Sequence, residues 1–203
     1  MCRQPFGVHP LVRAALAVVT AWLLAACGSS APTFHSIDVT GANYGHDFRL
    51  TDPDGRERTL ADFRGKVVMI YFGFIQCPDV CPTALSRAVE VRRLLGADAD
   101  RLQLVFITVD PERDTGEILK AYTAEFDPSF LGLSASLEGT REVAEQFRVF
   151  FRKVPTGDSY TMDHGTTSYV FDPAGRPRLA VAHAQTAQSI AADVKALLQD
   201  PKS

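Results

Sequence analysis

The sequence KVVMIYFGFIQCPDVCPTAL, residues 66–85, contains the pattern that decides the fold. Its first part, Lys66–Phe72, is a nearly continuous apolar run, which is typical of a strand buried on both faces of a sheet. Apolar residues then recur at helical spacing from Pro82 onward, and proline is favoured at the first position of a helix. We therefore predict a buried strand followed by a helix that begins at Pro82, with Cys81 as its cap and Cys77 in the preceding turn.

The rest of the chain continues this alternation of strands and helices. The predicted elements are a small hairpin at residues 48–60, strands at 66–72, 101–109, 167–172 and 178–182, and helices at 82–95, 114–125, 140–147 and 189–198. This order predicts the α/β class, with a thioredoxin-like mixed sheet flanked by helices and an extra N-terminal β-hairpin.

The first 26 residues have the pattern of a secretory signal. Arg3 and Arg13 supply positive charge, and the apolar run at residues 14–26 is shorter than the roughly 20 apolar residues of a membrane-spanning helix. The run ends in Leu-Ala-Ala before Cys27, which resembles the bacterial lipobox and implies cleavage before Cys27 and lipidation of its thiol. A single-pass membrane anchor is the alternative interpretation.

We therefore expect three segments. Residues 1–26 form a lipoprotein signal peptide, residues 27–43 contain the lipidated cysteine and a flexible tether, and residues 44–203 form the thioredoxin-like domain. Loss of the signal peptide would lower the formal net charge from −3 to −5, because it removes two arginines and no acidic residue. The chain has no dense cluster of basic residues, so this composition argues against binding to nucleic acid.

Two cysteines remain once Cys2 leaves with the signal and Cys27 is lipidated. Cys77 and Cys81 lie where a strand meets a helix N-terminus, which stabilises a thiolate. A disulfide that closes so short a loop would stabilise the fold little, which argues against a structural bridge. Positions four apart on a helix have Cβ atoms about 5–6 Å apart, whereas a disulfide needs about 3.8 Å. This spacing leaves both a redox pair and a metal site open.

His164 is the best candidate for a third ligand. It lies in a polar loop just before the strand predicted at 167–172, and that loop should face the cysteines across the carboxyl edge of the sheet. The other histidines, His35, His46 and His183, lie in the tether, before the hairpin and after the last strand. Two thiolates and one imidazole suit one copper ion per chain, whereas structural zinc would require a fourth ligand.

Three aspartates are candidates for a supporting role around the metal ligands. Asp79 lies between the two cysteines, Asp110 follows the strand at 101–109, and Asp163 precedes His164. The alternatives are structural, because Asp79 would also complement the helix N-terminus and Asp110 would also end its strand.

Several motifs in this order resemble the Sco/SenC family, membrane-tethered copper-binding proteins with a thioredoxin fold that assist assembly of cytochrome c oxidase. The matching segments are Gly65-Lys66, YFGF at 71–74, CPDVCP at 77–82, VDPERDT at 109–115, LKAY at 119–122, FLGL at 130–133, and Asp163-His164. The resemblance implies that Cys77, Cys81 and His164 bind copper. The chain departs from the family pattern at Gly116, where proline is usual, and at Ile75-Gln76, neither of which is a ligand.

The resemblance also implies a function. We expect a copper chaperone that serves the dinuclear copper site of cytochrome c oxidase subunit II, and the sequence leaves open whether it also acts as an enzyme. The alternative is a thiol–disulfide oxidoreductase that uses Cys77 and Cys81 to reduce the cysteines of that site or of other exported proteins. Expected partners are subunit II, a periplasmic copper donor, a thiol reductant and the membrane, through the lipid anchor. The expected location is the bacterial cell envelope, on the inner membrane with the domain facing the periplasm.

The segment before the strand at 167–172 helps to separate these two functions. Thioredoxin-like oxidoreductases place a proline there, facing the cysteines, whereas this chain has Gly165-Thr166-Thr167. Three features together favour a metal site over a redox pair. The proline is missing, the cysteines are separated by three residues where the thioredoxin redox motif has two, and His164 is present.

Overall fold

The fold is described from a computed structural model that places residues 32–200. The predicted signal peptide and Cys27 lie outside the described residues. Among residues 32–200, no helix combines the length and the apolar character needed to cross a membrane. The residues from Thr33 onward form one compact unit.

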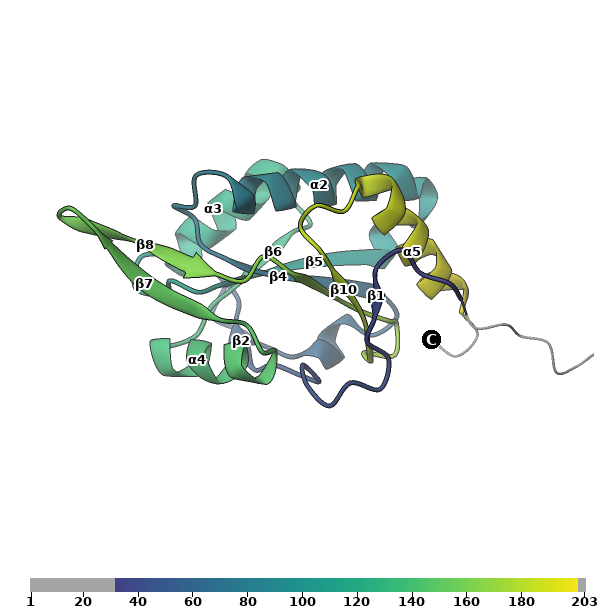
Figure 1. The fold of residues 1–203 in the computed structure, drawn as a ribbon, viewed down its shortest axis with the longest axis horizontal. Coiled ribbons are helices and arrows are strands. Elements are labelled where there is room, and N and C mark those ends of the chain that lie inside the picture. The colour runs from purple at the N-terminus through teal and green to yellow at the C-terminus, as the bar shows by residue number, and fades with distance from the viewer. Residues whose placement is uncertain (1–31, 201–203) are drawn as a thin grey trace, which may run out of the picture. The chain divides into compact units, whose positions relative to one another are not determined.

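A six-stranded mixed sheet forms the centre of the fold (Figure 1). In spatial order its strands are β1 (Ile37–Asp38), β10 (Pro177–Val181), β9 (Ser168–Phe171), β4 (Val67–Gly73), β5 (Leu102–Thr108) and β6 (Leu131–Leu133). The last three are parallel to one another, whereas β9 runs antiparallel to β4 and β10 antiparallel to β9. The predicted mixed sheet is therefore confirmed.

Helices cover both faces of this sheet (Figure 1). One face carries α2 (Val80–Leu95), α3 (Gly116–Phe126) and α5 (Ala187–Gln199), and the other carries α4 (Leu137–Gln146). Two short 3-10 helices precede strands of the sheet: η1 (Leu60–Phe63) leads to β4, and η2 (Gly96–Arg101) leads from α2 to β5. Every residue of β4 is buried, as expected for a strand covered on both sides. The predicted thioredoxin-like layering is thus the observed one.

Two hairpins lie outside the central sheet. The predicted N-terminal hairpin is β2 (Leu50–Thr51) paired with β3 (Glu57–Arg58). The second, β7 (Phe151–Thr156) paired with β8 (Ser159–His164), projects from the body of the domain (Figure 1). This second hairpin was not predicted from the sequence, although Gly157-Asp158 is a hairpin turn signal. Pro155 obscures the strand pattern, because a proline within such a run argues against a central strand. It is tolerated here because each strand of a two-stranded ribbon has a free edge.

Helix α2 begins earlier than predicted. It starts at Val80 with Asp79 as its N-cap, so Cys81 lies inside the first turn instead of capping it. Pro82 is then the third residue of the helix. This position is tolerated because the first N–H groups of a helix have no intrahelical acceptor, so a missing proton there costs no hydrogen bond.

The sheet also begins earlier than the predicted domain boundary at residue 44. Ile37–Asp38 pairs with β10, inside the segment expected to be a flexible tether. Just before it, the buried carboxylate of Asp193 on α5 accepts hydrogen bonds from the backbone N–H groups of His35 and Ser36, at 2.7 and 2.9 Å. The Asp193 carboxylate thus holds residues 35 and 36 on the domain, next to β1. A sequence pattern does not reveal such a contact, because the partners are far apart in the chain.

Candidate metal centre

The two cysteines lie where β4 leads into α2. The chain leaves the sheet at Gly73 and turns through a hydrogen bond from the Cys77 N–H to the Phe74 carbonyl, at 3.3 Å. Cys81, in the first turn of α2, donates its N–H to the Cys77 sulfur at 3.4 Å. Both side chains are buried free thiols, with Cys81 completely buried. The loop therefore presents two sulfurs side by side at the carboxyl edge of the sheet.

His164 comes from a different part of the fold, the second hairpin. It is the last residue of β8 and pairs with Phe151, so it is the end of a strand and not part of a loop as predicted. Its ring packs edge-on against Tyr71 and Phe74, with ring centroids 6.2 and 5.7 Å away. These two aromatic side chains, both buried, hold the imidazole at a fixed angle.

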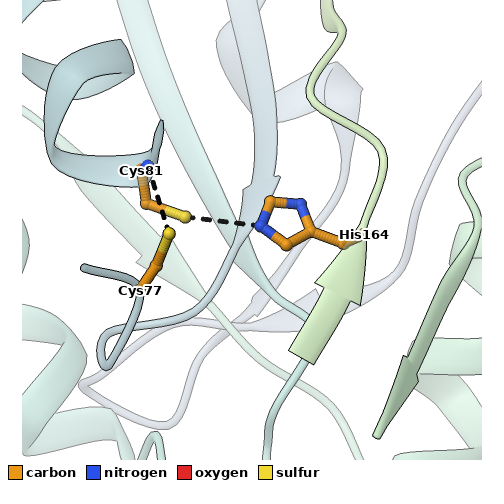
Figure 2. Close-up of side chains that lie close together, drawn as sticks. All are labelled: Cys77, Cys81 and His164. Carbon is orange, nitrogen blue, oxygen red and sulfur yellow. Dashed lines mark hydrogen bonds between the residues drawn. The ribbon is translucent and has the colours of Figure 1, made fainter. Parts of the chain in front are cut away.

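The structure brings the three predicted ligands together (Figure 2). Figure 2 shows the side chains of Cys77, Cys81 and His164 pointing toward one another from the cysteine loop, α2 and β8. The Cys81 sulfur lies 3.5 Å from His164 Nε2, and the three candidate ligand atoms all lie within 4.8 Å of one another. The predicted proximity of His164 to the cysteine pair is therefore observed.

The hydrogen bonding of His164 leaves one ring nitrogen available. Nδ1 lies 2.8 Å from the carbonyl oxygen of Gly165. Because a carbonyl can only accept, Nδ1 carries the proton in this contact and Nε2 presents its lone pair to the cysteine side. This is the arrangement that metal-bound histidines typically adopt, with the second nitrogen fixed by a backbone carbonyl.

The two thiols have opposite protonation behaviour. The hydrogen bond from the Cys81 thiol lowers the pKa of Cys77 to about 5, although partial burial opposes this shift. The same bond, together with burial, raises the pKa of Cys81 well above its usual value. At neutral pH the pair therefore contains one thiolate, Cys77, and one thiol, Cys81.

Tyr71 adds a buried hydroxyl next to this pair. Its hydroxyl is buried beside the Cys81 thiol, and this burial raises its pKa. Tyr71 and Gly73 lie on the same face of β4, because side chains alternate along a strand. A Cβ atom on Gly73 would lie 2.9 Å from the Cys81 sulfur and 2.8 Å from Phe106, so only glycine lets the helix approach this closely.

Neither Tyr71 nor Gly73 was predicted from the sequence to be part of the site. The signal for Gly73 was present, because a glycine inside a buried strand often marks close approach of another element. Tyr71 had no comparable signal, since a tyrosine in an apolar strand usually belongs to the core.

The three candidate aspartates lie around the ligands without joining them. Asp79 occupies the N-cap position of α2 without a capping hydrogen bond from its side chain, and its carboxylate lies 3.4 Å from the Thr83 hydroxyl. Asp110 is buried and accepts hydrogen bonds from Arg113 and Tyr160. Asp163 is half-exposed and pairs with Arg152. None of these belongs to the group of possible metal ligands found among residues 32–200, and neither do His35, His46 and His183.

The donor set fits a soft metal ion. Two sulfurs and one imidazole nitrogen match the ligand preference of Cu(I), and imidazole also suits Cu(II). Within the described residues the cluster holds three ligand atoms, one fewer than a structural zinc site uses. The buried rings of Tyr71 and Phe74 form an apolar wall beside His164.

Comparisons with known proteins place the chain in one family. A family model described as SCO1/SenC matches residues 38–199. Among curated proteins, the mitochondrial SCO2 homolog of Bos taurus is 40% identical over 153 residues, which are 73% of this chain and 58% of the bovine protein. The SCO2-like protein of Rickettsia felis is 37% identical over 65% of this chain and 66% of its own length. The chain thus spans about half to two thirds of the curated relatives it matches.

Two solved structures are also similar. The structure of Bradyrhizobium japonicum ScoI with copper bound has 43% sequence identity and a TM-score of 0.69, covering 75% of this chain and 98% of that one. The structure of Arabidopsis thaliana ScoI with copper bound has 32% identity and a TM-score of 0.72, covering 78% and 99% of the two chains.

Replacing Gly73 with alanine should disturb the cysteine site. The new Cβ would overlap the Cys81 sulfur and the Phe106 ring, so we expect a loss of about 1–3 kcal/mol in the free energy of unfolding. Chemical denaturation measures this loss. Gly165→Ala is the matched control, because it lies next to His164 but a Cβ there meets only Val149, at 4.0 Å. Equal stability of the two variants would contradict the close packing of α2 on Gly73.

The thiolate of Cys77 should persist to unusually low pH. As pH falls through about 5, Cys77 takes up a proton, and above that value it remains ionised. The ultraviolet absorbance of the thiolate, followed against pH in the reduced protein, measures the midpoint. Cys81→Ala removes the donated hydrogen bond, so the midpoint should rise toward the ordinary cysteine value of about 8.5. An unchanged midpoint in that variant would mean that Cys81 does not stabilise the thiolate.

Proposed function

This chain belongs to the SCO1/SenC family, and from that premise we propose that it is a copper chaperone that holds one copper ion through Cys77, Cys81 and His164. The observation that carries the proposal is the group of two sulfurs and one imidazole nitrogen within 4.8 Å of one another. Two structures of similar proteins with copper bound support the choice of metal. Copper is here the cargo, so the site must both take it up and release it.

The protonation states of the three ligand side chains determine which protons must leave when copper binds. Cys77 is already a thiolate, so it attracts the incoming cation without first losing a proton. Cys81 retains its proton and must release it when its sulfur becomes a ligand. His164 offers Nε2 without rearrangement, because Nδ1 is already held by Gly165. Binding one copper ion therefore releases one proton, which couples uptake to pH.

The proposed destination is the dinuclear copper site of cytochrome c oxidase subunit II. A periplasmic donor would supply the copper, and a thiol reductant would keep Cys77 and Cys81 reduced. We also propose that residues 1–26 are a lipoprotein signal peptide and that Cys27 carries the lipid. The domain would then be held at the outer surface of a bacterial inner membrane, facing the periplasm.

A second candidate function rests on the low pKa of Cys77. A thiolate next to a buried thiol is the pair that a disulfide reductase uses. The Cys77 thiolate would attack a disulfide in the target and release one target thiolate. Cys81 would then displace the second target sulfur, leaving the target reduced and a disulfide between Cys77 and Cys81. Copper binding needs this same pair reduced, so the two functions are compatible.

Replacing His164 with alanine should weaken Cu(II) binding while leaving the fold intact. Loss of one of three ligands should remove most of the affinity and alter the sulfur-to-copper charge-transfer bands. Titration with copper against a competing chelator, followed by absorbance, measures both effects. His46→Ala is the matched control, since His46 is exposed and outside the ligand group. Parent-like affinity in the His164→Ala variant would exclude His164 as a ligand.

The reductase function can be tested with an oxidised fragment of subunit II. If copper delivery is the main role, the reduced copper-free protein should reduce the fragment slowly, and the copper-loaded protein should transfer its metal to the previously reduced fragment. Mass spectrometry of alkylated thiols measures the first reaction and absorbance the second. Fast disulfide exchange without any metal transfer would favour the reductase function instead.

A further inference from the structure

The loop between β5 and α3 contacts both halves of the metal centre but contributes no ligand. The centre has two halves because Cys77 and Cys81 lie in the loop before α2 and in its first turn, whereas His164 lies on the β7–β8 hairpin. The distance between the halves depends on what connects the hairpin to the cysteine loop. Residues 109–115 lie between them and hydrogen bond to each.

On the cysteine side, two consecutive residues hold the loop that contains Cys77. The buried carboxylate of Asp114 accepts hydrogen bonds from the Ile75 N–H at 3.1 Å and from the Thr108 hydroxyl at 2.6 Å. Arg113 donates through Nη1 to the side-chain oxygen of Gln76, at 2.9 Å. Both contacts fall on the two residues immediately before Cys77.

On the hairpin side, Arg113 and Asp110 hold Tyr160. The same Nη1 of Arg113 donates to the Tyr160 carbonyl at 2.9 Å, and the guanidinium lies 3.7 Å from the centre of the tyrosine ring. Asp110 accepts from the Tyr160 hydroxyl at 2.9 Å and from Arg113 Nε at 2.5 Å. Tyr160 and His164 are four residues apart on β8, so their side chains lie on the same face of the strand.

We propose that Arg113 is a positioning residue that sets where His164 stands relative to the cysteine pair. One guanidinium nitrogen contacts both halves of the site, through Gln76 and through Tyr160. The arginine is largely buried, and the buried carboxylate of Asp110 neutralises its charge. A planar guanidinium can stack on a ring and donate in several directions at once, which a lysine ammonium on a flexible stem cannot do.

The role of His164 as a copper ligand is taken from the proposed function, so the test has one part that involves copper and one part that does not. The main variant is Arg113→Lys, which keeps a positive charge beside Asp110 but cannot bridge Gln76 and Tyr160 in the same way. Arg113→Ala would leave the buried Asp110 carboxylate without its partner and would risk unfolding the protein. Tyr160→Phe is a second variant, which removes only the hydroxyl contact with Asp110.

The copper part is a double-mutant cycle. Arg113→Lys should lower Cu(II) affinity by about 10-fold in the parent, as for residues that orient a metal ligand. It should have no effect in the His164→Ala background, because there is no imidazole left to position. An equal loss in both backgrounds, or no loss in the parent, would overturn the proposal.

The second part uses the copper-free protein and hydrogen–deuterium exchange. Arg113→Lys, and more weakly Tyr160→Phe, should speed the exchange of amides in residues 75–77 and 159–164 together. Arg152→Lys is the matched control, because Arg152 is on the same hairpin but forms an exposed pair with Asp163, and its exchange should stay parent-like. Unchanged exchange in Arg113→Lys would overturn the proposal, whether or not the parent binds copper. Failure of the parent to bind copper would instead contradict the proposed function.

Discussion

The close approach of α2 to the end of β4 is the constraint on which the metal centre depends. Gly73 has no side chain, so the Cys81 sulfur can lie against the strand itself. The helix N-terminus then places Cys81 next to Cys77, and the same face of β4 contributes Tyr71 to the wall around His164. A larger residue at position 73 would move the helix, and with it one of the two sulfurs.

The site is divided between elements that have different origins in the chain. The cysteines are buried and belong to the loop after β4 and to the first turn of α2. The histidine belongs to a two-stranded hairpin, which has few buried residues of its own and depends on the body of the domain. The hairpin is held on the body of the domain by aromatic packing around the imidazole and by the contacts of Arg113 with Tyr160. The geometry of the three ligands is therefore a property of tertiary contacts and not of any single element.

The sequence predicted the parts of this structure that follow from local patterns. The apolar run at 66–72 and the helical spacing after Pro82 were enough for the central strand, its helix and the class of fold. The start of that helix was misplaced because proline is allowed throughout the first turn, so its position does not mark the first residue. The pairing of Ile37–Asp38 with β10 could not be predicted, because it depends on the carboxylate of Asp193, more than 150 residues away in the chain. The closeness of His164 to the cysteine pair was predicted from its place before β9, although the hairpin that carries it was missed.

The edge strand β1 has a mechanical consequence. In the sheet it is separated from β4 by β10 and β9, and it lies on the opposite side of the domain from the β7–β8 hairpin (Figure 1). A force applied to the chain at Thr33 would therefore enter through β10 and, by way of Asp193, through α5. The β7–β8 hairpin lies outside this load path, whereas α5 packs on α2, the helix that carries Cys81. A pull at that end would therefore reach the cysteine side of the site before the histidine side.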